Sequence, residues 1–183
     1  MVAHGQLDAA AWVSAAIHLL AEQGVDGVRV ELLAARLGVT KGRFYWLFKD
    51  RDALLEAMLA EWRSHATLAI IERVEQHADL PVERLRRLLR ITIVGPRVEW
   101  GADVELSIRI WARQDARARS ALKEVDQLRL RYLERLLVAC GTPENEAAAR
   151  AIVAYSYMRV AGSLIGQQQE ALMAQCEALV IGV

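Results

Sequence analysis

The stretch Leu33–Phe48, LAARLGVTKGRFYWLF, decides the fold of this 183-residue chain, because it is typical of the second and third helices of a helix-turn-helix. Ala34 is a small residue four positions before Gly38, so one helix can end while a second crosses closely over it. Gly38 can take the positive φ that a helix C-terminus often needs, and the Thr40 hydroxyl is placed to cap the next helix. We therefore predict a tight turn between two helices in this stretch.

The predicted third helix has two unlike sides. At helical spacing, the apolar side carries Phe44, Leu47 and Phe48, and the other side carries Lys41, Gly42, Tyr45, Trp46 and Lys49. A short helix held by its apolar side suits a DNA groove, since lysines and a tyrosine hydroxyl can meet phosphate oxygens. We expect Arg43 and Trp46 to read bases, because arginine pairs with guanine and an indole can pack on a thymine methyl.

The charges of the chain also gather in this stretch. The whole sequence is neutral, with 23 basic and 23 acidic residues. Residues 36–51 nevertheless contain five basic residues and only one acidic residue, Asp50. The basic residues are Arg36, Lys41, Arg43, Lys49 and Arg51. An ordinary helical hairpin with a solvated basic face is the alternative. The local excess favours DNA, which a neutral chain can attract only through such a patch.

The same residues resemble a known family. Gly38-Val39-Thr40-Lys41-Gly42, Tyr45 two residues before Leu47-Phe48, and the run Lys49–Leu55 are similar to the DNA-binding domain of the tetracycline-repressor (TetR) family. The resemblance covers about residues 8–58. It implies an all-helical homodimer with an operator-binding N-terminal domain and a C-terminal domain that binds a small molecule.

The resemblance also implies roles for single residues. Lys41, Tyr45 and Lys49 match positions that usually touch phosphates in that family. Two positions depart from the family pattern. Arg29 stands where a capping serine or threonine is frequent, and Trp46 stands where a histidine is frequent. Arg29 is therefore a further candidate for a phosphate contact, without the capping hydroxyl.

Composition favours a helical globular protein, with 54% apolar residues and only 3 prolines. No apolar run of about 18 residues predicts a membrane span, and the N-terminus carries no signal pattern, so we expect a cytoplasmic protein. Cys140 and Cys176 are expected to pack as small hydrophobes. The four histidines lack the spacing of a metal site, and no cofactor is predicted. Because no phosphate loop, nucleophile elbow or metalloprotease motif occurs, we expect no enzyme.

Helix signals along the chain predict an all-α fold. An N-terminal three-helix domain over residues 1–50 is followed by a ligand-binding and dimerisation domain over residues 51–183. The first four predicted helices are Asp8 to Gly24, Glu31 to Leu37, the third helix described above, and Arg51 to about His77. The next three begin at Pro81 or run from Asp103 to Arg113 and from Ala116 to Cys140. The last two run from Pro143 to Gly166, with Thr142 as cap, and from Gln168 to Val180. The fourth of these is long enough, at ~40 Å, to join a DNA-binding head to a separate core.

Apolar stripes predict which side of each later helix is buried. The fourth helix is expected to bury Leu55, Met58, Leu59, Trp62, Ala66, Ala69 and Ile70, and the sixth carries Leu106, Ile110 and Trp111. The fifth helix carries a basic outer strip, expected to be solvated, of Arg84, Arg86, Arg87 and Arg90. Glu105 and Arg109 are expected to form a surface ion pair.

The last two predicted helices are rich in small and apolar residues, so they can approach their symmetry mates and form a four-helix homodimer interface. The alternative is that they only complete the core of one chain. A mostly apolar effector pocket is expected from large or adaptable side chains with a polar group from Arg109 or His65. The pocket candidates are Trp62, His65, Trp100, Arg109, Trp111, Tyr155 and Met158.

These features favour a homodimeric repressor that binds a palindromic double-stranded DNA operator and is released by a small apolar or aromatic ligand. An all-helical small-molecule binding protein without operator-specific DNA binding is the alternative, and a small helical enzyme is a weaker one. The last alternative lacks any supporting motif.

Overall fold

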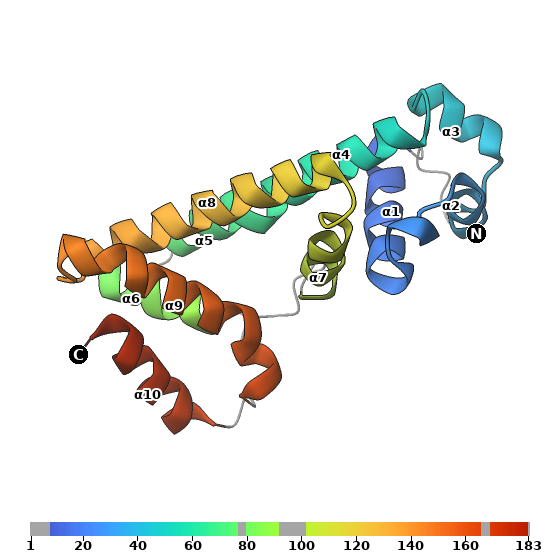
Figure 1. Ribbon diagram of the computed structural model, residues 1–183. Helices are drawn as coiled ribbons and strands as arrows, with labels where there is room; N and C mark the ends of the chain where they lie inside the picture. The colour runs from blue at the N-terminus through green and yellow to red at the C-terminus, as the bar shows by residue number, and fades with distance from the viewer. Residues whose placement is uncertain (1–7, 77–79, 92–101, 166–168, 183) are drawn as a thin grey trace. The chain divides into compact units, whose positions relative to one another are not determined.

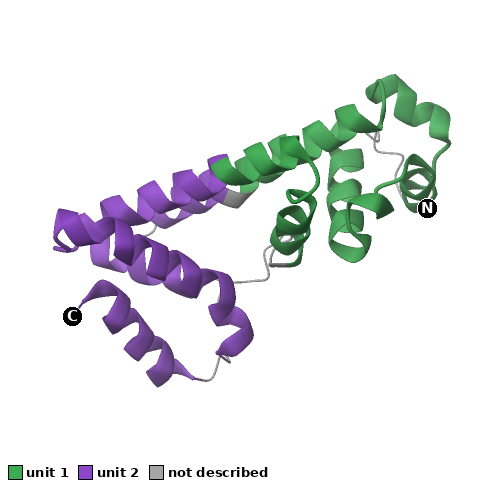
Figure 2. Ribbon diagram, viewed as in Figure 1, with its two compact units in different colours: residues 1–65, 99–123 green, residues 66–98, 124–183 purple. Residues whose placement is uncertain are grey.

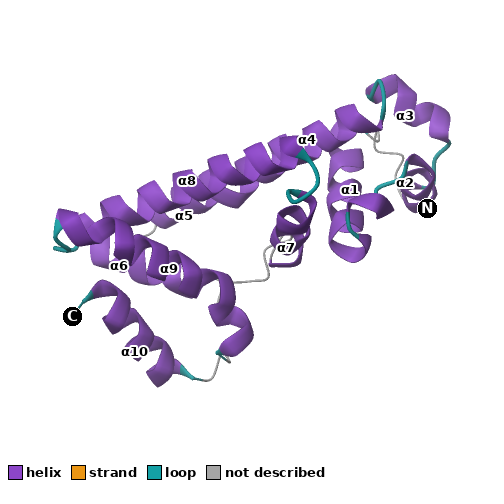
Figure 3. Cartoon of the chain, viewed as in Figure 1, coloured by secondary structure: helices purple, strands orange, loops and turns teal. Residues whose placement is uncertain are grey.

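The computed structural model describes residues 8–76, 80–91, 102–165 and 169–182, and all regular structure in these ranges is helical (Figure 3). Its ten α-helices are α1 (Ala9–Gln23), α2 (Val30–Leu37), α3 (Lys41–Leu47), α4 (Arg51–Arg63), α5 (Ala69–Gln76), α6 (Pro81–Arg90), α7 (Ala102–Trp111), α8 (Ala116–Ala139), α9 (Glu144–Leu164) and α10 (Glu170–Ile181). The prediction of an all-α fold is confirmed. None of the described helices is both long enough and apolar enough to span a membrane.

The chain forms two compact units (Figure 2). The first comprises residues 1–65 and 99–123, and the second comprises residues 66–98 and 124–183. Helices α1 to α4 and α7 belong to the first unit, where α1 packs against α2, α4 and α7 (Figure 1). The second unit contains α5, α6, α9 and α10. The predicted division of function at residue 50 stays a prediction.

Carboxylate caps begin two helices of the first unit. The Ala11 N–H donates to Asp8 at 3.0 Å and starts α1. The Ala53 N–H donates to Asp50 at 2.9 Å and starts α4. Such caps satisfy backbone donors that the first helical turn leaves open. Helices α1 and α4 are therefore fixed at their N-terminal ends.

The two predicted threonine caps are wrong. Thr40 occupies the N-cap position of α3, but only its backbone takes part, with the Arg43 N–H donating to the Thr40 carbonyl at 3.1 Å. Thr142 uses its N–H to close the end of α8 on the Leu137 carbonyl at 3.0 Å. The Thr142 side chain is buried, and its hydroxyl has no partner in the described residues. The residue at the N-cap of α9 is Pro143 instead.

The predicted long fourth helix is interrupted. A π-helical turn, Ser64–Leu68, separates α4 from α5. The buried face of α4 is confirmed at Leu55, Met58, Leu59 and Trp62. A π turn adds a residue and so rotates the face that follows. For this reason Ala69, expected inside, is exposed, while Thr67 is buried and Ile70 is half-buried; the Ala66 side chain lies outside the described residues.

Helix α7 buries a different stripe from the one expected. Trp111 is buried as expected, but it is accompanied by Val104 and Ile108, whereas Leu106 and Ile110 are exposed. Both sets have helical spacing, so the periodicity of the sequence could not separate them. The packing of α7 against α1 buries Val104 and Ile108 in place of Leu106 and Ile110.

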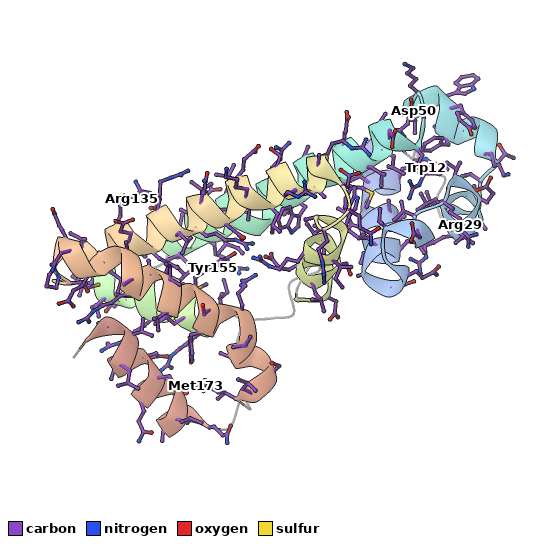
Figure 4. The ribbon with its side chains drawn as sticks, viewed as in Figure 1. Trp12, Arg29, Asp50, Arg135, Tyr155 and Met173 are labelled. Atoms are coloured by element: carbon purple, nitrogen blue, oxygen red, sulfur yellow. The ribbon has the colours of Figure 1, made fainter. Side chains whose placement is uncertain are left out.

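The core of the second unit joins α5, α6, α8, α9 and α10. Its buried residues are Val74, Leu85, Leu88, Leu89, Tyr132, Leu133, Leu136, Leu137, Ala151, Ala154, Tyr155, Met158, Val180 and Ile181. Beside this core, Met173 of α10 packs with Ala161 and Ile165 (Figure 4).

One arginine of the predicted solvated strip on α6 has a structural role. Arg90 donates to the carboxylate of Glu177, which is only 3% exposed, and to Glu170 at 2.7 Å, so that it ties α6 to α10. A buried carboxylate requires such a partner, because burying an unpaired charge is costly. Arg86 and Arg87 are exposed as expected.

Candidate nucleic-acid interface

The turn between α2 and α3 has the predicted geometry. Gly38 lies in the left-handed region at φ 67°, and its N–H donates to the Ala35 carbonyl at 3.2 Å. The Val39 N–H reaches back to the Ala34 carbonyl at 2.9 Å, which completes a Schellman closure of α2. Ala34 is buried, as the close crossing of two helices requires.

Phe44 anchors the reading helix α3. Its side chain is 0% exposed, and its ring meets Trp12 of α1 edge-on at 5.3 Å and stacks with Phe48 at 5.3 Å. Leu47, expected on this buried side, is exposed. The helix ends at Leu47, and Phe48 follows in extended backbone. Phe48, rather than Leu47, therefore packs against Phe44 on the buried side.

The opposite side of α3 is open to solvent. All of its predicted contact residues, Thr40, Lys41, Gly42, Arg43, Tyr45, Trp46 and Lys49, are exposed, and the Trp46 indole is 85% exposed. Arg29 is exposed at the N-cap of α2 and makes no capping bond (Figure 4). We refer to these eight residues as the reading face. An exposed indole between basic side chains is unusual for a plain solvated helix and suits a surface that a partner covers.

Several cations of the charged stretch are engaged within the protein. Lys41 Nζ lies 2.7 Å from Glu31, and Arg36 Nη2 lies 2.7 Å from Glu22. Arg51 donates to the carbonyls of Val25 and Val28, at 2.6 Å each, and so ties α4 to the segment before α2.

The local charge count did not predict these partners, because each lies ten or more residues from its basic residue in the sequence. In the described part of the chain, Arg43 and Lys49 form no ion pair. The positive charge available to a partner is therefore smaller than the sequence indicated.

The predicted ligand residues fall in both units. Trp62 and Trp111 are buried in the first unit, and Tyr155 and Met158 are buried in the second. His65 is exposed beside Glu61, with Nδ1 3.2 Å from its carboxylate. Trp100 lies outside the described residues. Whether these side chains hold a ligand stays a prediction.

The expected pair of Arg109 and Glu105 is present, with 2.9 Å between nitrogen and oxygen. Glu105 is buried, however, so the pair is not confined to the surface of α7. Burial makes the charged hydrogen bond more important to the helix than a solvated pair would be.

Tyr155 is the centre of a polar cluster in the second unit (Figure 4). Its hydroxyl donates to Asp126 at 2.6 Å and accepts from Arg129 Nη1 at 2.8 Å. The guanidinium groups of Arg129 and Arg159 lie 5.9 and 5.2 Å from the centre of the tyrosine ring. The sequence singled out Tyr155 but not its charged partners, because Asp126 and Arg129 lie 29 and 26 residues earlier in the chain. Within the described ranges, no three His, Cys, Asp or Glu side chains converge as metal ligands.

Comparison with known proteins identifies the N-terminal domain. The family described as "Bacterial regulatory proteins, tetR family" matches residues 13–58, which run from α1 into α4. Residues 13–58 are thus similar to the N-terminal domain of the TetR family. The tetracycline repressor protein class A from transposon 1721 of Escherichia coli is 48% identical over 58 residues, which are 30% of this chain and 27% of that protein. The chain thus spans about a quarter of the length of the curated relatives it matches.

Solved structures extend the likeness to the whole fold. A transcriptional regulator from Rhodococcus sp. Rha1 has a TM-score of 0.71 at 21% identity, over 95% of this chain and 94% of that one. AibR, solved in complex with isovaleryl coenzyme A and operator DNA, has a TM-score of 0.68 at 19% identity, over 95% and 96%. At these identities the likeness concerns the fold alone.

Proposed function

We propose that this chain is a transcriptional regulator: a homodimeric repressor that binds a palindromic DNA operator and is released from it by a small ligand. The observation that carries the proposal is the construction of α3, whose single aromatic anchor, Phe44, is fully buried while Lys41, Tyr45 and Trp46 are exposed. A helix held in this way can enter the major groove with its outer side chains toward DNA. The match to the tetR family, over residues 13–58, lies in the same domain.

The reading face divides into two kinds of contact. Lys41, Lys49, Tyr45 and Arg29 suit phosphate oxygens, which orient the protein on the duplex. Arg43 and Trp46 suit base edges, as an arginine for guanine and an indole for a thymine methyl. We expect Arg43→Ala to relax sequence preference, and Tyr45→Ala to weaken binding to every sequence alike.

A homodimer through the last two helices is supported by an apolar surface that the single chain leaves uncovered. The exposed apolar residues of α9 and α10 are Ile152, Val153, Val160, Leu164, Leu172 and Leu179; Leu164 is 75% exposed and Leu179 83%. Between Ile152 and Leu164, the exposed residues of α9 carry no charge, and several are as small as Ser156 and Gly162. Surfaces of this kind pack well in helix–helix interfaces between subunits. The two reading helices of such a dimer would meet half-sites about one or two helical turns apart.

An apolar or aromatic effector is supported by the buried aromatic residues predicted to line its pocket. AibR, of similar fold, is solved with an acyl thioester and operator DNA. Trp62 lies in the last turn of α4, directly before the π-helical turn, so a ligand beside it would act on the helix that follows α3. The ligand can release DNA only by binding one state of the protein more tightly than the other.

Selection of bound duplexes from random DNA tests the regulator proposal. We expect recovery of one palindromic site by the wild-type chain and loss of recovery by Tyr45→Ala with Lys49→Ala. Compounds are then screened for their ability to release the recovered duplex from the protein. Trp62→Ala should lose this ligand response, and Trp62→Phe should keep it. Ligand binding without any enriched site would favour the alternative, an all-helical binding protein that does not recognise an operator.

A further inference from the structure

One carboxylate lies beside the reading face, in contact with Lys41. Glu31, in the first turn of α2, places Oε1 2.7 Å from Nζ of Lys41, and its side chain is 59% exposed. It is the only acidic residue between Arg29 and Lys49. The carboxylate therefore lies beside the first residue of the reading helix rather than on a remote side of the domain.

Glu31 is held in its charged form by its surroundings. The hydrogen bond from Lys41 lowers the pKa of its carboxyl group, helped by a backbone hydrogen bond and by the charges of Lys41 and Arg29. Both cations belong to the reading face. Near neutral pH the site thus presents an ionised acceptor flanked by two groups that suit phosphates.

A carboxylate in this place is unfavourable to DNA binding unless it has a partner on the DNA. It repels phosphates, and it occupies an ammonium group that could otherwise meet one. The major groove offers donors only at the N4 amino group of cytosine and the N6 amino group of adenine. Carboxylates accept from the N4 amino group of cytosine, whereas the N7 acceptor on the same base as N6 of adenine disfavours a carboxylate there.

We propose, on the basis of the function proposed above, that Glu31 is a specificity-determining residue that accepts a hydrogen bond from the N4 amino group of a cytosine. Lys41 then acts as its positioning partner. An ammonium group has three donors, so Lys41 can hold the carboxylate with one and meet a phosphate with another. The ion pair of the free protein is kept in the complex.

Two substitutions separate this role from simple charge repulsion. Glu31→Gln keeps the length of the side chain but adds a donor, and glutamine pairs with both N6 and N7 of adenine. It should move the preference at one base pair of each half-site from cytosine to adenine. Glu31→Ala should remove the preference at that base pair, by about 5- to 150-fold, and leave the others.

Glu22→Gln is the matched control. Glu22 of α1 forms a similar exposed ion pair with Arg36 of α2, at 2.7 Å. Both helices belong to the same N-terminal domain as Glu31. This variant should bind the wild-type site with unchanged preference. Thermal melting of all three variants verifies that the exposed substitutions leave the fold intact.

The experiment is duplex selection from random DNA with the wild-type chain and the three variants. The proposal requires a cytosine-specific position that is lost in Glu31→Ala and replaced by adenine in Glu31→Gln. It is overturned if Glu31→Ala binds all sequences more tightly with the wild-type preference, since Glu31 would then only neutralise Lys41. Failure of the wild-type chain to enrich any sequence would instead overturn the proposed regulator, and this inference with it.

Discussion

Arg117, in the first turn of α8, donates through Nη2 to Oδ1 of Asp52 over 3.2 Å and so ties α8 to the first turn of α4. The same guanidinium lies 2.9 Å from Asp115 and 3.9 Å from Glu56. Single exposed pairs contribute little, but shared groups hold their geometry better than isolated ones. Since α4 follows the reading helix directly, this network fixes the start of α4 against α8 within the first unit.

Asp115 makes this network sensitive to acid. The hydrogen bond from Arg117 lowers the pKa of its carboxyl group from 3.8 to about 2, helped by the N–H groups of Ala118 and Arg117. The unfolded chain therefore binds more protons than the folded chain between these values. The contribution to stability, at most about 2 kcal/mol, is present above about pH 4 and is lost as the pH falls toward 2. Urea unfolding from pH 2 to 5 should show a shallower acid slope for Asp115→Asn; an unchanged slope contradicts this assignment.

Gly42 is expected to matter for DNA rather than for folding. A Cβ added there would meet only the Thr40 hydroxyl, at an ordinary 3.7 Å, so the protein itself has room for a side chain. Gly42→Ala should leave the melting temperature unchanged or raise it, with up to about 1 kcal/mol in favour of the helix. We expect weaker DNA binding, because the added methyl stands between the α3 backbone and the duplex. Wild-type affinity would show that this backbone does not approach DNA.

Lys41 and Lys49 should contribute electrostatically in unequal amounts. Replacing either with alanine should reduce the salt slope of DNA binding by about 1 per chain. The loss of affinity should be larger for Lys41, because its removal also leaves the Glu31 carboxylate unpaired beside the phosphates. Lys123, the only other lysine, is exposed on α8 and provides the control. Titrations at several salt concentrations test this, and a wild-type slope for Lys49→Ala contradicts it.

The exposed face of α9 should control assembly. Val160→Glu places a charge on the apolar surface of α9 and should convert dimers to monomers in sedimentation at micromolar concentration. Val138→Glu alters an apolar residue of α8 that is exposed outside this surface and should leave the dimer intact. A dimer that survives Val160→Glu, or a wild-type chain that sediments only as a monomer, excludes this interface.

Glu177 should stabilise the second unit more than Glu170 does. Both accept from Arg90, but Glu177 is buried and Glu170 is exposed. Replacing Glu177 with glutamine weakens a buried charged pair, which can cost about 3 kcal/mol, whereas Glu170→Gln should cost less than about 1 kcal/mol. Equal midpoints for the two variants in urea unfolding would show that the buried bond contributes nothing special.

Local signals in the sequence predicted the local parts of the fold. Gly38 and Asp50 act on residues within five positions of themselves, so the turn and the start of α4 could be predicted. The choice between two stripes of equal spacing on α7 depended on packing against α1, and the π-helical turn after α4 has no glycine or proline to indicate it.

The reading face itself was predictable because its residues are close in the chain. The ion pairs of the charged stretch were not predictable, because Glu22 and Glu31 lie on the earlier helices α1 and α2. Similarly, the bond between Arg90 and Glu177 joins residues 87 positions apart, so only the packing of α6 with α10 shows that a member of the basic strip is structural.

The fluorescence of Trp46 tests most directly whether α3 docks on DNA. Trp12, Trp62 and Trp111 are buried, so Trp46 is the most exposed indole of the described residues. The difference between the wild-type chain and Trp46→Phe reports on it alone. We predict that this difference spectrum is quenched or shifted to shorter wavelength as the selected duplex saturates the protein, because docking removes the indole from water. Saturation of binding with an unchanged Trp46 spectrum would contradict the docking of this helix.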